Sequence, residues 1–384
     1  MEFTVTDDQQ ELIDAAARFS TERLAPTRRQ RERAGRLDPD LLATMGKLNL
    51  FGIELPERYG GLAQDRLTAG LVVEALSADD MNLGYVSVNI SLVSQILSTF
   101  GRPEVVDKVI SGMVAGQVMP SIALTEPGGG SDAANLSMRA ERVGDEYVLT
   151  GEKTSISHAT QADFCVVFAR TGPADSRAKG ISAFLVPLDA AGVSRTAFDD
   201  LGSRCIGRGS LFFDGVRIPA DHLLGEENRA FAQVMQGFDY SRALLGLMAL
   251  GVARKSLDET WEHVGQRQSF GRPLASYQGV SFPLAEAETH WLGARLVCLR
   301  TLWLKDRGLP HNAEAAMCKW WGPKLAYDIV NTCLLTHGHG AYSTEMPYEQ
   351  RLRDLLGLQI GDGTAQIMKL IIARDKAGRA AVDI

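Results

Sequence analysis

The chain has 384 residues, of which 45% are hydrophobic and 23% charged, and its formal net charge is −7. Its length exceeds that of one ordinary hydrophobic core and predicts two or three domains. The acidic balance offers no basic field for nucleic acid, and the five cysteines contain no C-x-x-C pair, so neither a disulfide framework nor a zinc site is expected.

The first part of the chain, residues 1–117, carries helical patterns. Thr6 followed by Gln9 matches a capping box, in which two side chains satisfy free backbone amides at the start of a helix. Apolar residues then recur at helical spacing and form one stripe: Leu12, Ile13, Ala16, Phe19 and Leu24. The pattern breaks at Pro56 and returns from about residue 67 to residue 100. We expect an N-terminal helical domain.

The texture changes near Val118, and residues 118–226 carry short runs rich in β-branched and aromatic residues. Turn-forming residues separate these runs, which are Tyr147–Leu149, Phe164–Phe168, Ile181–Val186 and Leu211–Ile218. They predict a middle antiparallel β-barrel. Helix-length segments do not alternate with the runs, which disfavours a doubly wound nucleotide-binding fold.

Helical patterns return in residues 227–384 and predict a C-terminal four-helix bundle. They cover roughly 228–265, 276–307, 311–336 and 362–380, with short connections between them. The fold class is therefore mainly α with a central β domain. The most apolar run, Ala243–Ala253, is too short to span a bilayer. A signal peptide is not visible, and we expect a cytoplasmic protein that contacts neither membrane nor nucleic acid.

Three local sequences can carry chemistry. The first, Leu124–Asp132, contains Gly128, Gly129 and Gly130, whose backbone can approach a ligand closely and can cradle a phosphate. The second, Gly151–Ser157, follows a predicted strand and ends in a hydroxyl that can donate to a ring nitrogen. Each of these two stretches, taken by itself, is more typical of a plain loop or hairpin.

The third sequence, Gly361–Ile367, opens the last helical pattern and places Asp362 between two glycines. An aspartate there is most often the N-cap of the helix. It can also be a carboxylate that its flexible neighbours hold against a substrate. If Asp362 is only a cap, a base must be sought elsewhere, and Asp79 and Asp80 are the alternatives.

Taken together, the order and spacing of these motifs resemble the acyl-CoA dehydrogenase family over nearly the whole chain. Supporting stretches are Arg267–Leu274, His337–Gly340 and Arg351–Asp354. The resemblance implies an N-terminal helical domain, a middle β-barrel and a C-terminal bundle, usually as a homotetramer that binds FAD. The implied reaction is α,β-desaturation of an acyl-CoA thioester, an oxidoreductase activity on a CH–CH group, with electron-transfer flavoprotein as the usual electron acceptor.

The resemblance also assigns residues position by position. Asp362 matches the catalytic base. The residues that match FAD contacts, some of them to a neighbouring subunit's FAD, are Ile122, Leu124, Thr125, Gly130, Ser131, Ser155, Ile156, Ser157, Arg267, Phe270, Gln278, Gly338, Thr364 and Gln366. Ser157 stands where the family places a hydroxyl on flavin N5. The residues that match substrate contacts are Ser131, Asp239, Arg242 and Gly363.

The chain departs from the family at several of these positions. The usual base is Glu rather than Asp362, and a second branch places its Glu where this chain has Ser241. Ser155 stands where the family commonly has Trp, and Leu334 replaces a residue that is commonly polar. A shorter base beside a vacated wall favours the alicyclic branch, which acts on thioesters such as cyclohexane-1-carboxyl-CoA. His337 and His339 lack acidic or cysteine partners, so a metal is not expected.

Two other functions compete with this interpretation. Nitroalkane oxidase has the same fold and also uses Asp as a base, but it needs no CoA site. Arg242 and Ser131, as candidate CoA contacts, favour the dehydrogenase. A flavin-bearing nucleic-acid-binding protein of this fold would need a basic face, and 40 Lys and Arg against 47 Asp and Glu argue against one.

Overall fold

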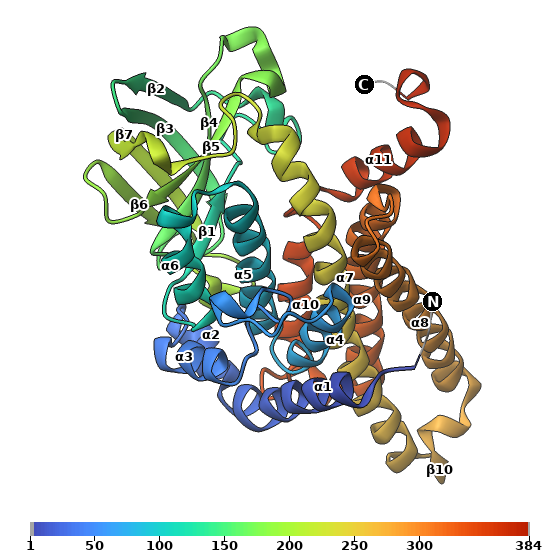
Figure 1. Ribbon diagram of the computed structural model, residues 1–384. Coiled ribbons are helices and arrows are strands. Elements are labelled where there is room, and N and C mark those ends of the chain that lie inside the picture. Colours follow the sequence, from blue (N-terminus) through green and yellow to red (C-terminus); the bar gives the residue numbers. More distant parts are fainter. Residues whose placement is uncertain (1–3, 383–384) are drawn as a thin grey trace.

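The computed structural model describes residues 4–382, apart from the side chains of residues 232–236. The first segment is helical, and Figure 1 shows its helices packed below the β domain. They are α1 (Asp7–Phe19), α2 (Arg28–Ala34), α3 (Pro39–Lys47), α4 (Arg66–Leu76), α5 (Met81–Phe100) and α6 (Pro103–Val114). The Thr6–Gln9 capping box is present at the start of α1, as predicted.

The middle segment is an eight-stranded sheet. Its strands are β1 (Pro120–Ala123), β2 (Arg139–Val143), β3 (Glu146–Ile156), β4 (Phe164–Arg170), β5 (Ile181–Pro187), β6 (Val193–Ala197), β7 (Gly209–Pro219) and β8 (Leu223–Leu224). They lie in the order β6-β7-β3-β2-β4-β5-β8, and β1 pairs with β4. The β1–β4 and β2–β4 pairings are parallel, whereas the other pairings are antiparallel. The expected antiparallel barrel is therefore a mostly antiparallel sheet with two parallel pairings.

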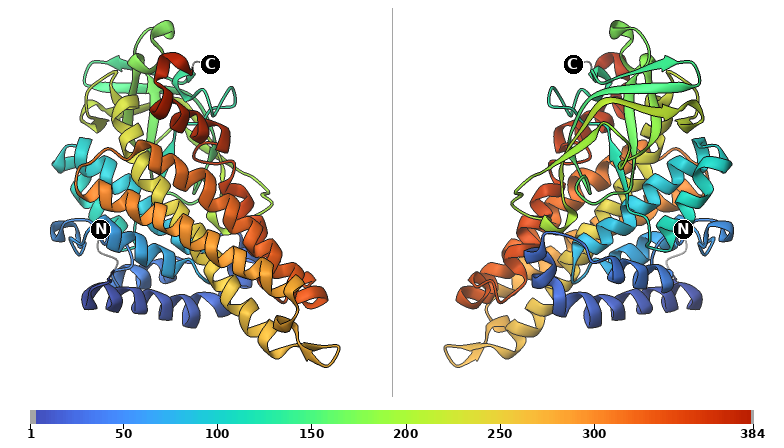
Figure 2. Two further views of the ribbon diagram at one scale, coloured as in Figure 1. Left: turned by 90° about the vertical axis from the view of Figure 1, so that its right-hand side faces the viewer. Right: turned by 90° about the vertical axis from the view of Figure 1, so that its left-hand side faces the viewer.

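The last segment is dominated by three long helices that run side by side (Figure 2). They are α7 (Ala230–Gln266), α8 (Gln278–Asp306) and α9 (Asn312–His337), and the shorter α10 (Tyr348–Leu358) and α11 (Ala365–Ala377) follow. A two-stranded hairpin, β9 (Gln268–Ser269) with β10 (Arg272–Pro273), joins α7 to α8. The sequence patterns did not predict α10, so the four expected helical segments are five helices.

Two hydrophobic cores hold these segments together. One joins the N-terminal helices to the sheet, and the other lies inside the C-terminal bundle. Helix α5 contributes to both, since Leu83 and Val86 belong to the first core while Met81 and Val88 belong to the second. The mainly α fold with a central β domain is thus confirmed. The domain limits at 117/118 and 226/227 stay predictions.

Helix α5 is long and apolar enough to cross a membrane by length and composition alone. However, 72% of its most apolar window is buried inside the protein. Burial of that kind is expected of a core helix, and it agrees with the place of α5 between the two cores.

Candidate active site

The segment between α10 and α11 places Asp362 in an unusual backbone conformation. Asp362 has φ of 55°, in the left-handed region that Asp and Asn tolerate better than most residues. The N-cap of α11 is Thr364, whose Oγ1 accepts the hydrogen bond from the Ile367 amide. The alternative in which Asp362 caps the helix is therefore wrong, and its carboxylate is free for another role.

Three ionisable side chains from three helices interact electrostatically with the Asp362 carboxylate. Burial raises the pKa of Asp362, while Lys319 on α9 and Arg242 on α7 act in the opposite direction. The Asp362 charge in turn helps to raise the pKa of Tyr85 on α5, behind the larger effect of burial. By surface area Asp362 is nevertheless exposed. The carboxylate therefore has many protein atoms around it and is still accessible to solvent.

Lys319 holds the segment that carries Asp362. Its side chain is 1% exposed, and its ammonium donates to the carbonyls of Leu358 (2.6 Å) and Gly363 (3.3 Å). These carbonyls lie on either side of Asp362 in the chain. Burial lowers the pKa of Lys319 to about 8, although Asp362 opposes the shift. The contacts tie the loop to α9 and keep a cation beside the carboxylate.

Arg242 is a second buried cation at this end of the bundle. Its Nη1 donates to Asp239 at 2.6 Å, but its Nε has no hydrogen-bond partner among the described residues. The side chain is only 7% exposed, so an unpaired Nε costs free energy unless a ligand satisfies it. The hydroxyl of Ser241 donates to the carbonyl of Phe238, and this residue supplies no base.

Ser157 lies at the end of β3, where its hydroxyl and its carbonyl are both held. The hydroxyl of Tyr85 donates to Ser157 Oγ at 3.0 Å, and Ser121 Oγ donates to the Ser157 carbonyl at 2.7 Å. Tyr85 also interacts electrostatically with Asp362, which indicates that Ser157 and Asp362 lie near each other. These two residues are 205 positions apart and lie in different segments of the fold.

The glycine-rich loop runs along the surface from the end of β1. Thr125 is half-buried, whereas Gly130 and Ser131 are exposed. A Cβ built on Gly128 or Gly129 would meet no described heavy atom within 4 Å, and neither residue has a positive φ. Crowding within the chain therefore does not require these glycines. Close approach of a ligand to the backbone would require them, and FAD fits this loop.

A buried ion pair fixes the base of the same loop. Lys153 is 0% exposed and donates to Glu126 at 2.7 Å and to the Leu124 carbonyl at 3.1 Å. Glu126 also accepts from the amides of Ser137 and Met138. The pair therefore connects the loop to β3, and Ile122 and Leu124 lie half-buried at its start.

Ser155 and Ile156 differ in their surroundings. Ser155 is exposed with φ of 59°, and its Oγ accepts from Arg208 at 3.3 Å, while Ile156 is buried in the core. Arg208 is paired with Asp200 and lies over the ring of Phe198. The Arg208 side chain therefore lies against Ser155, and the space beside this small residue is not empty.

Four of the predicted FAD residues lie at the other end of the bundle. Arg267, Phe270, Gln278 and Gly338 are exposed there, and Phe270 is 95% exposed. The stacking of His263 on His337, with ring centroids 4.1 Å apart, brings the ends of α7 and α9 together. Helical rise separates Arg242 from Arg267 by roughly 38 Å. Arg242 and these four residues therefore cannot contact the same small region of one ligand. Thr364 and Gln366, in contrast, lie close to Asp362 in the chain.

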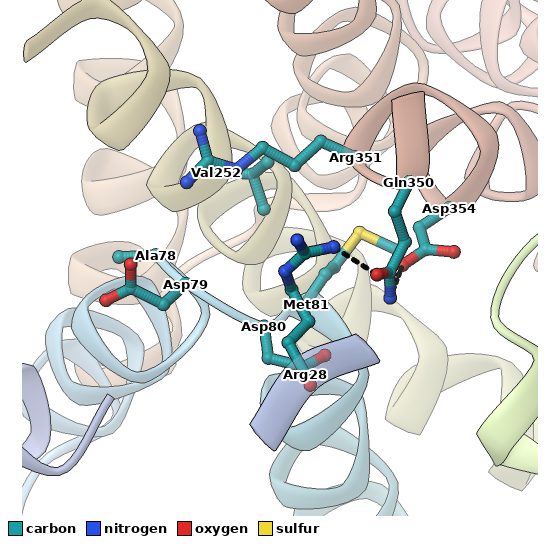
Figure 3. Close-up of a pocket in the computed structure, with 9 residues that line it drawn as sticks. All are labelled: Arg28, Ala78, Asp79, Asp80, Met81, Val252, Gln350, Arg351 and Asp354. Carbon is teal, nitrogen blue, oxygen red and sulfur yellow. Dashed lines mark hydrogen bonds between the residues drawn. The ribbon is translucent and has the colours of Figure 1, made fainter. Parts of the chain in front are cut away.

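The alternative bases Asp79 and Asp80 lie in a different place, beside the small buried cavity of Figure 3. The cavity measures about 10 Å³, which is space for about one water molecule. Asp80 is paired with Arg31 at 2.7 Å, and Asp79 lies 3.6 Å from the Lys255 ammonium. A cavity of this size excludes a thioester, so neither aspartate is a suitable base. Within residues 4–382, no cluster of His, Cys, Asp and Glu could hold a metal ion.

Comparison with known proteins agrees with this fold. Three family models match: the acyl-CoA dehydrogenase N-terminal domain over residues 6–117, the middle domain over 121–216 and the C-terminal domain over 228–376. The Bacillus subtilis protein named Probable acyl-CoA dehydrogenase YngJ is 33% identical over 97% of this chain and 99% of its own length. Benzylmalonyl-CoA dehydrogenase of Aromatoleum aromaticum is 32% identical over 98% and 99%.

Solved structures give the same result. Butyryl-CoA dehydrogenase from Megasphaera elsdenii superimposes with a TM-score of 0.94 at 30% identity, covering 98% of this chain and 100% of that one. The fold and the site thus define a flavoprotein oxidoreductase. The chain belongs to the acyl-CoA dehydrogenase family, whose members use FAD and oxidise the CH–CH group of acyl-CoA thioesters.

Two residues of the site, Tyr85 and Lys319, were missed by sequence reasoning. Each leaves a weak signal in the sequence, because Tyr85 is a phenol in the apolar run of α5 and Lys319 is a lone cation after Ala315, Ala316 and Met317. A polar residue inside a buried helical stripe needs a partner. The sequence alone does not show what that partner is.

Proposed function

We propose that this protein desaturates an acyl-CoA thioester between Cα and Cβ, with Asp362 as the base that removes the α-proton. The observation that carries the proposal is the convergence of Asp362, Arg242, Lys319 and Ser157 on one site. Thr364 caps the helix, so Asp362 serves no structural purpose there that would explain it. A carboxylate of raised pKa is also better matched to proton removal near neutral pH.

Each residue has a distinct task in this proposal. Arg242, with an unpaired Nε, binds the CoA part of the substrate together with Asp239, Ser131 and Gly363. Lys319 fixes the loop so that the short carboxylate meets the substrate Cα. When bound, FAD accepts the hydride from Cβ, and its chemistry is that of the cofactor. Ile122, Leu124, Thr125, Gly130, Ser155, Ile156 and Ser157 would hold the flavin and its pyrophosphate.

The exposed end of the bundle completes the proposal. Arg267, Phe270, Gln278 and Gly338, with Thr364 and Gln366, would hold the adenosine-diphosphate half of an FAD, and the first four lie too far away to serve their own chain's flavin. A homotetramer, the family's usual assembly, would bring a neighbour's cofactor to them. We also propose electron-transfer flavoprotein as the electron acceptor and the cytoplasm as the location.

The test is anaerobic titration of the purified protein with acyl-CoA thioesters. We expect about one FAD per chain and bleaching of its visible absorbance by a suitable thioester. A colourless protein that takes up no FAD on reconstitution would overturn the proposal. Consumption of oxygen with nitroethane, without bleaching by any thioester, would favour nitroalkane oxidase instead.

For the acyl group, we propose a cyclic or branched chain such as cyclohexane-1-carboxyl-CoA. The support is the short Asp362 side chain together with Ser155 in place of a large aromatic ring, provided that the partly exposed Arg208 side chain beside Ser155 moves away from the substrate. A relative is named for benzylmalonyl-CoA, a thioester that carries a ring. We expect Ser155→Trp to lower turnover of the cyclic substrate about tenfold more than turnover of hexanoyl-CoA. Preference of the wild type for hexanoyl-CoA would refute the cyclic substrate and leave the reaction type intact.

A further inference from the structure

Tyr85 contacts Ser157, a predicted flavin contact, and interacts electrostatically with Asp362, the proposed base. It belongs to α5, a core helix of the N-terminal segment, and its hydroxyl donates to Ser157 Oγ at 3.0 Å. Its ring lies beside that of His158, with centroids 5.8 Å apart. Tyr85 also interacts electrostatically with Asp362. One side chain therefore contacts the end of β3 and responds to the charge of the loop before α11.

The next turn of α5 holds the residue after Ser157. Asn89, four positions after Tyr85 and on the same helical face, donates to the Pro120 carbonyl at 2.8 Å and lies 3.0 Å from His158 Nδ1. Ser121 fixes the carbonyl of Ser157. The backbone at residues 157 and 158 is therefore held from β1 and α5. The remaining freedom at Ser157 is rotation of its hydroxyl group.

The number of hydrogen bonds that a serine hydroxyl can make explains how Tyr85 restricts the rotation of the Ser157 hydroxyl. A serine hydroxyl has one hydrogen and two acceptor lone pairs. With Tyr85 donating into one lone pair, the hydrogen of Ser157 has to point elsewhere. Tyr85 remains a donor because burial, and after it the nearby Asp362 charge, raise the pKa of its phenol. Its proton is thus retained across the working pH range.

We propose that Tyr85 is a positioning residue that orients the Ser157 hydroxyl as a donor toward the bound flavin. The inference rests on the proposed function, since it assumes that the flavin lies against Ser157. Tyr85 makes no contact with reacting atoms in this scheme. It acts through Ser157 by removing the orientations in which that hydroxyl would donate back into the protein.

The test is a double-mutant cycle on the holoenzyme with Tyr85→Phe, Ser157→Ala and both together. Tyr85→Phe keeps the ring and removes only the donor. We expect a shift of the bound flavin's visible absorbance and of its midpoint potential, and a fivefold to tenfold slower flavin reduction by acyl-CoA, in the range of one hydrogen bond. In the Ser157→Ala background, Tyr85→Phe should change the rate of flavin reduction by less than about twofold. It should then hardly shift the flavin absorbance or the midpoint potential.

A matched control is Tyr147→Phe, which removes another buried phenol that is bonded to Glu227 at 3.1 Å in the β domain. It should leave the flavin spectrum, potential and reduction rate unchanged, and thermal melting of both variants reports on folding. Equal effects of Tyr85→Phe with and without Ser157, or an unchanged spectrum and potential, would overturn the proposal. Either result would leave the desaturation activity of the wild type in place, so the two failures can be told apart.

Discussion

The two ends of helix α7 differ in how far their arginines are buried. Near its start, Arg242 is buried and paired with Asp239, and Asp362, Lys319 and Tyr85 approach from neighbouring elements. At its other end, Arg267 is exposed and the hairpin presents Phe270 to solvent. Both ends carry an arginine that the family resemblance assigns to a ligand. Other residues of the chain surround Arg242, whereas Arg267 is exposed to solvent.

Exposed apolar side chains also concentrate in the C-terminal segment, from the hairpin to the loop before α11. Among the side chains that the structure describes, seven of the eleven exposed large hydrophobic ones lie after residue 265: Phe270, Phe282, Leu292, Leu309, Leu335, Tyr342 and Ile360. Apolar surface concentrated in one part of a protein is typical of an interface. The comparison suggests that the reacting half of the site is completed within one chain, while the adenosine half needs a second copy.

The largest effect is expected at the completed end, from Asp362→Asn. The amide tolerates the left-handed backbone of residue 362 but cannot accept the α-proton. We expect folding, FAD binding and acyl-CoA binding to be retained, with flavin reduction slowed by at least roughly 10²-fold. Stopped-flow spectroscopy measures this step.

The control for this variant is Asp375→Asn, which changes a carboxylate on α11 away from the loop. It should reduce its flavin at the wild-type rate. If Asp362→Asn stays within a factor of a few of wild type, Asp362 is not the base. The buried end of α7 would then not lie beside the catalytic base.

A smaller effect is expected from Lys319→Met, which removes the cation and both carbonyl contacts. Because Lys319 lowers the pKa of Asp362, its loss raises that pKa further. The base works when deprotonated, so the acid limb of the rate profile should move to higher pH. On the acid side of the limb, the rate should fall about tenfold for each pH unit by which the limb moves. Part of the loss should be recovered at high pH.

Lys324→Met is the matched control, since Lys324 is an exposed lysine of the same helix that pairs with Asp328. Its profile should match that of the wild type, because exposed pairs contribute little. A Lys319→Met profile with an unmoved acid limb would show that Lys319 does not influence the base. Single-turnover flavin reduction between pH 6 and about pH 9 covers the range in which a base is tuned.

The smallest effect is expected at the open end, from Arg267→Ala. Loss of one charge-assisted contact should weaken FAD binding by about tenfold, without change in the fold. Equilibrium dialysis measures the affinity, and Arg217→Ala, which changes an exposed arginine of β7, is the control. Unchanged affinity would argue against a cofactor site shared between chains.

Much of the fold could be predicted from local sequence, because its periodic patterns reflect local physics. The capping box at Thr6 and the starts of α7, α8 and α9 depend on neighbouring residues, and the predictions lie close to the structure. Helix α10 was missed although Tyr348, Leu352 and Leu355 recur at helical spacing, because it is short and lies between two turn-rich stretches. The parallel pairing of β1 with β4 could not be predicted, because strand partners are set by contacts far apart in sequence.

Site residues that belong to a sequence motif could be predicted. Site residues whose role depends on burial could not. Asp362 and Ser157 stand in recognisable motifs. The tasks of Tyr85 and Lys319 depend on which elements pack beside α5 and α9, so local sequence does not show them. The same limit affected Asp362, because its role as a helix cap could be excluded only once Thr364 was seen to accept the hydrogen bond.

The Asp362–Gly363 dipeptide has a chemical consequence for the lifetime of the protein. Glycine lacks a Cβ, so its amide nitrogen can attack a preceding aspartyl carboxyl with little steric hindrance. Loss of water then closes a succinimide, and its hydrolysis returns either aspartate or isoaspartate. A glutamate would have to close a six-membered ring instead and reacts far more slowly. Using the shorter acid before glycine thus makes the proposed base of this chain a site of chemical ageing.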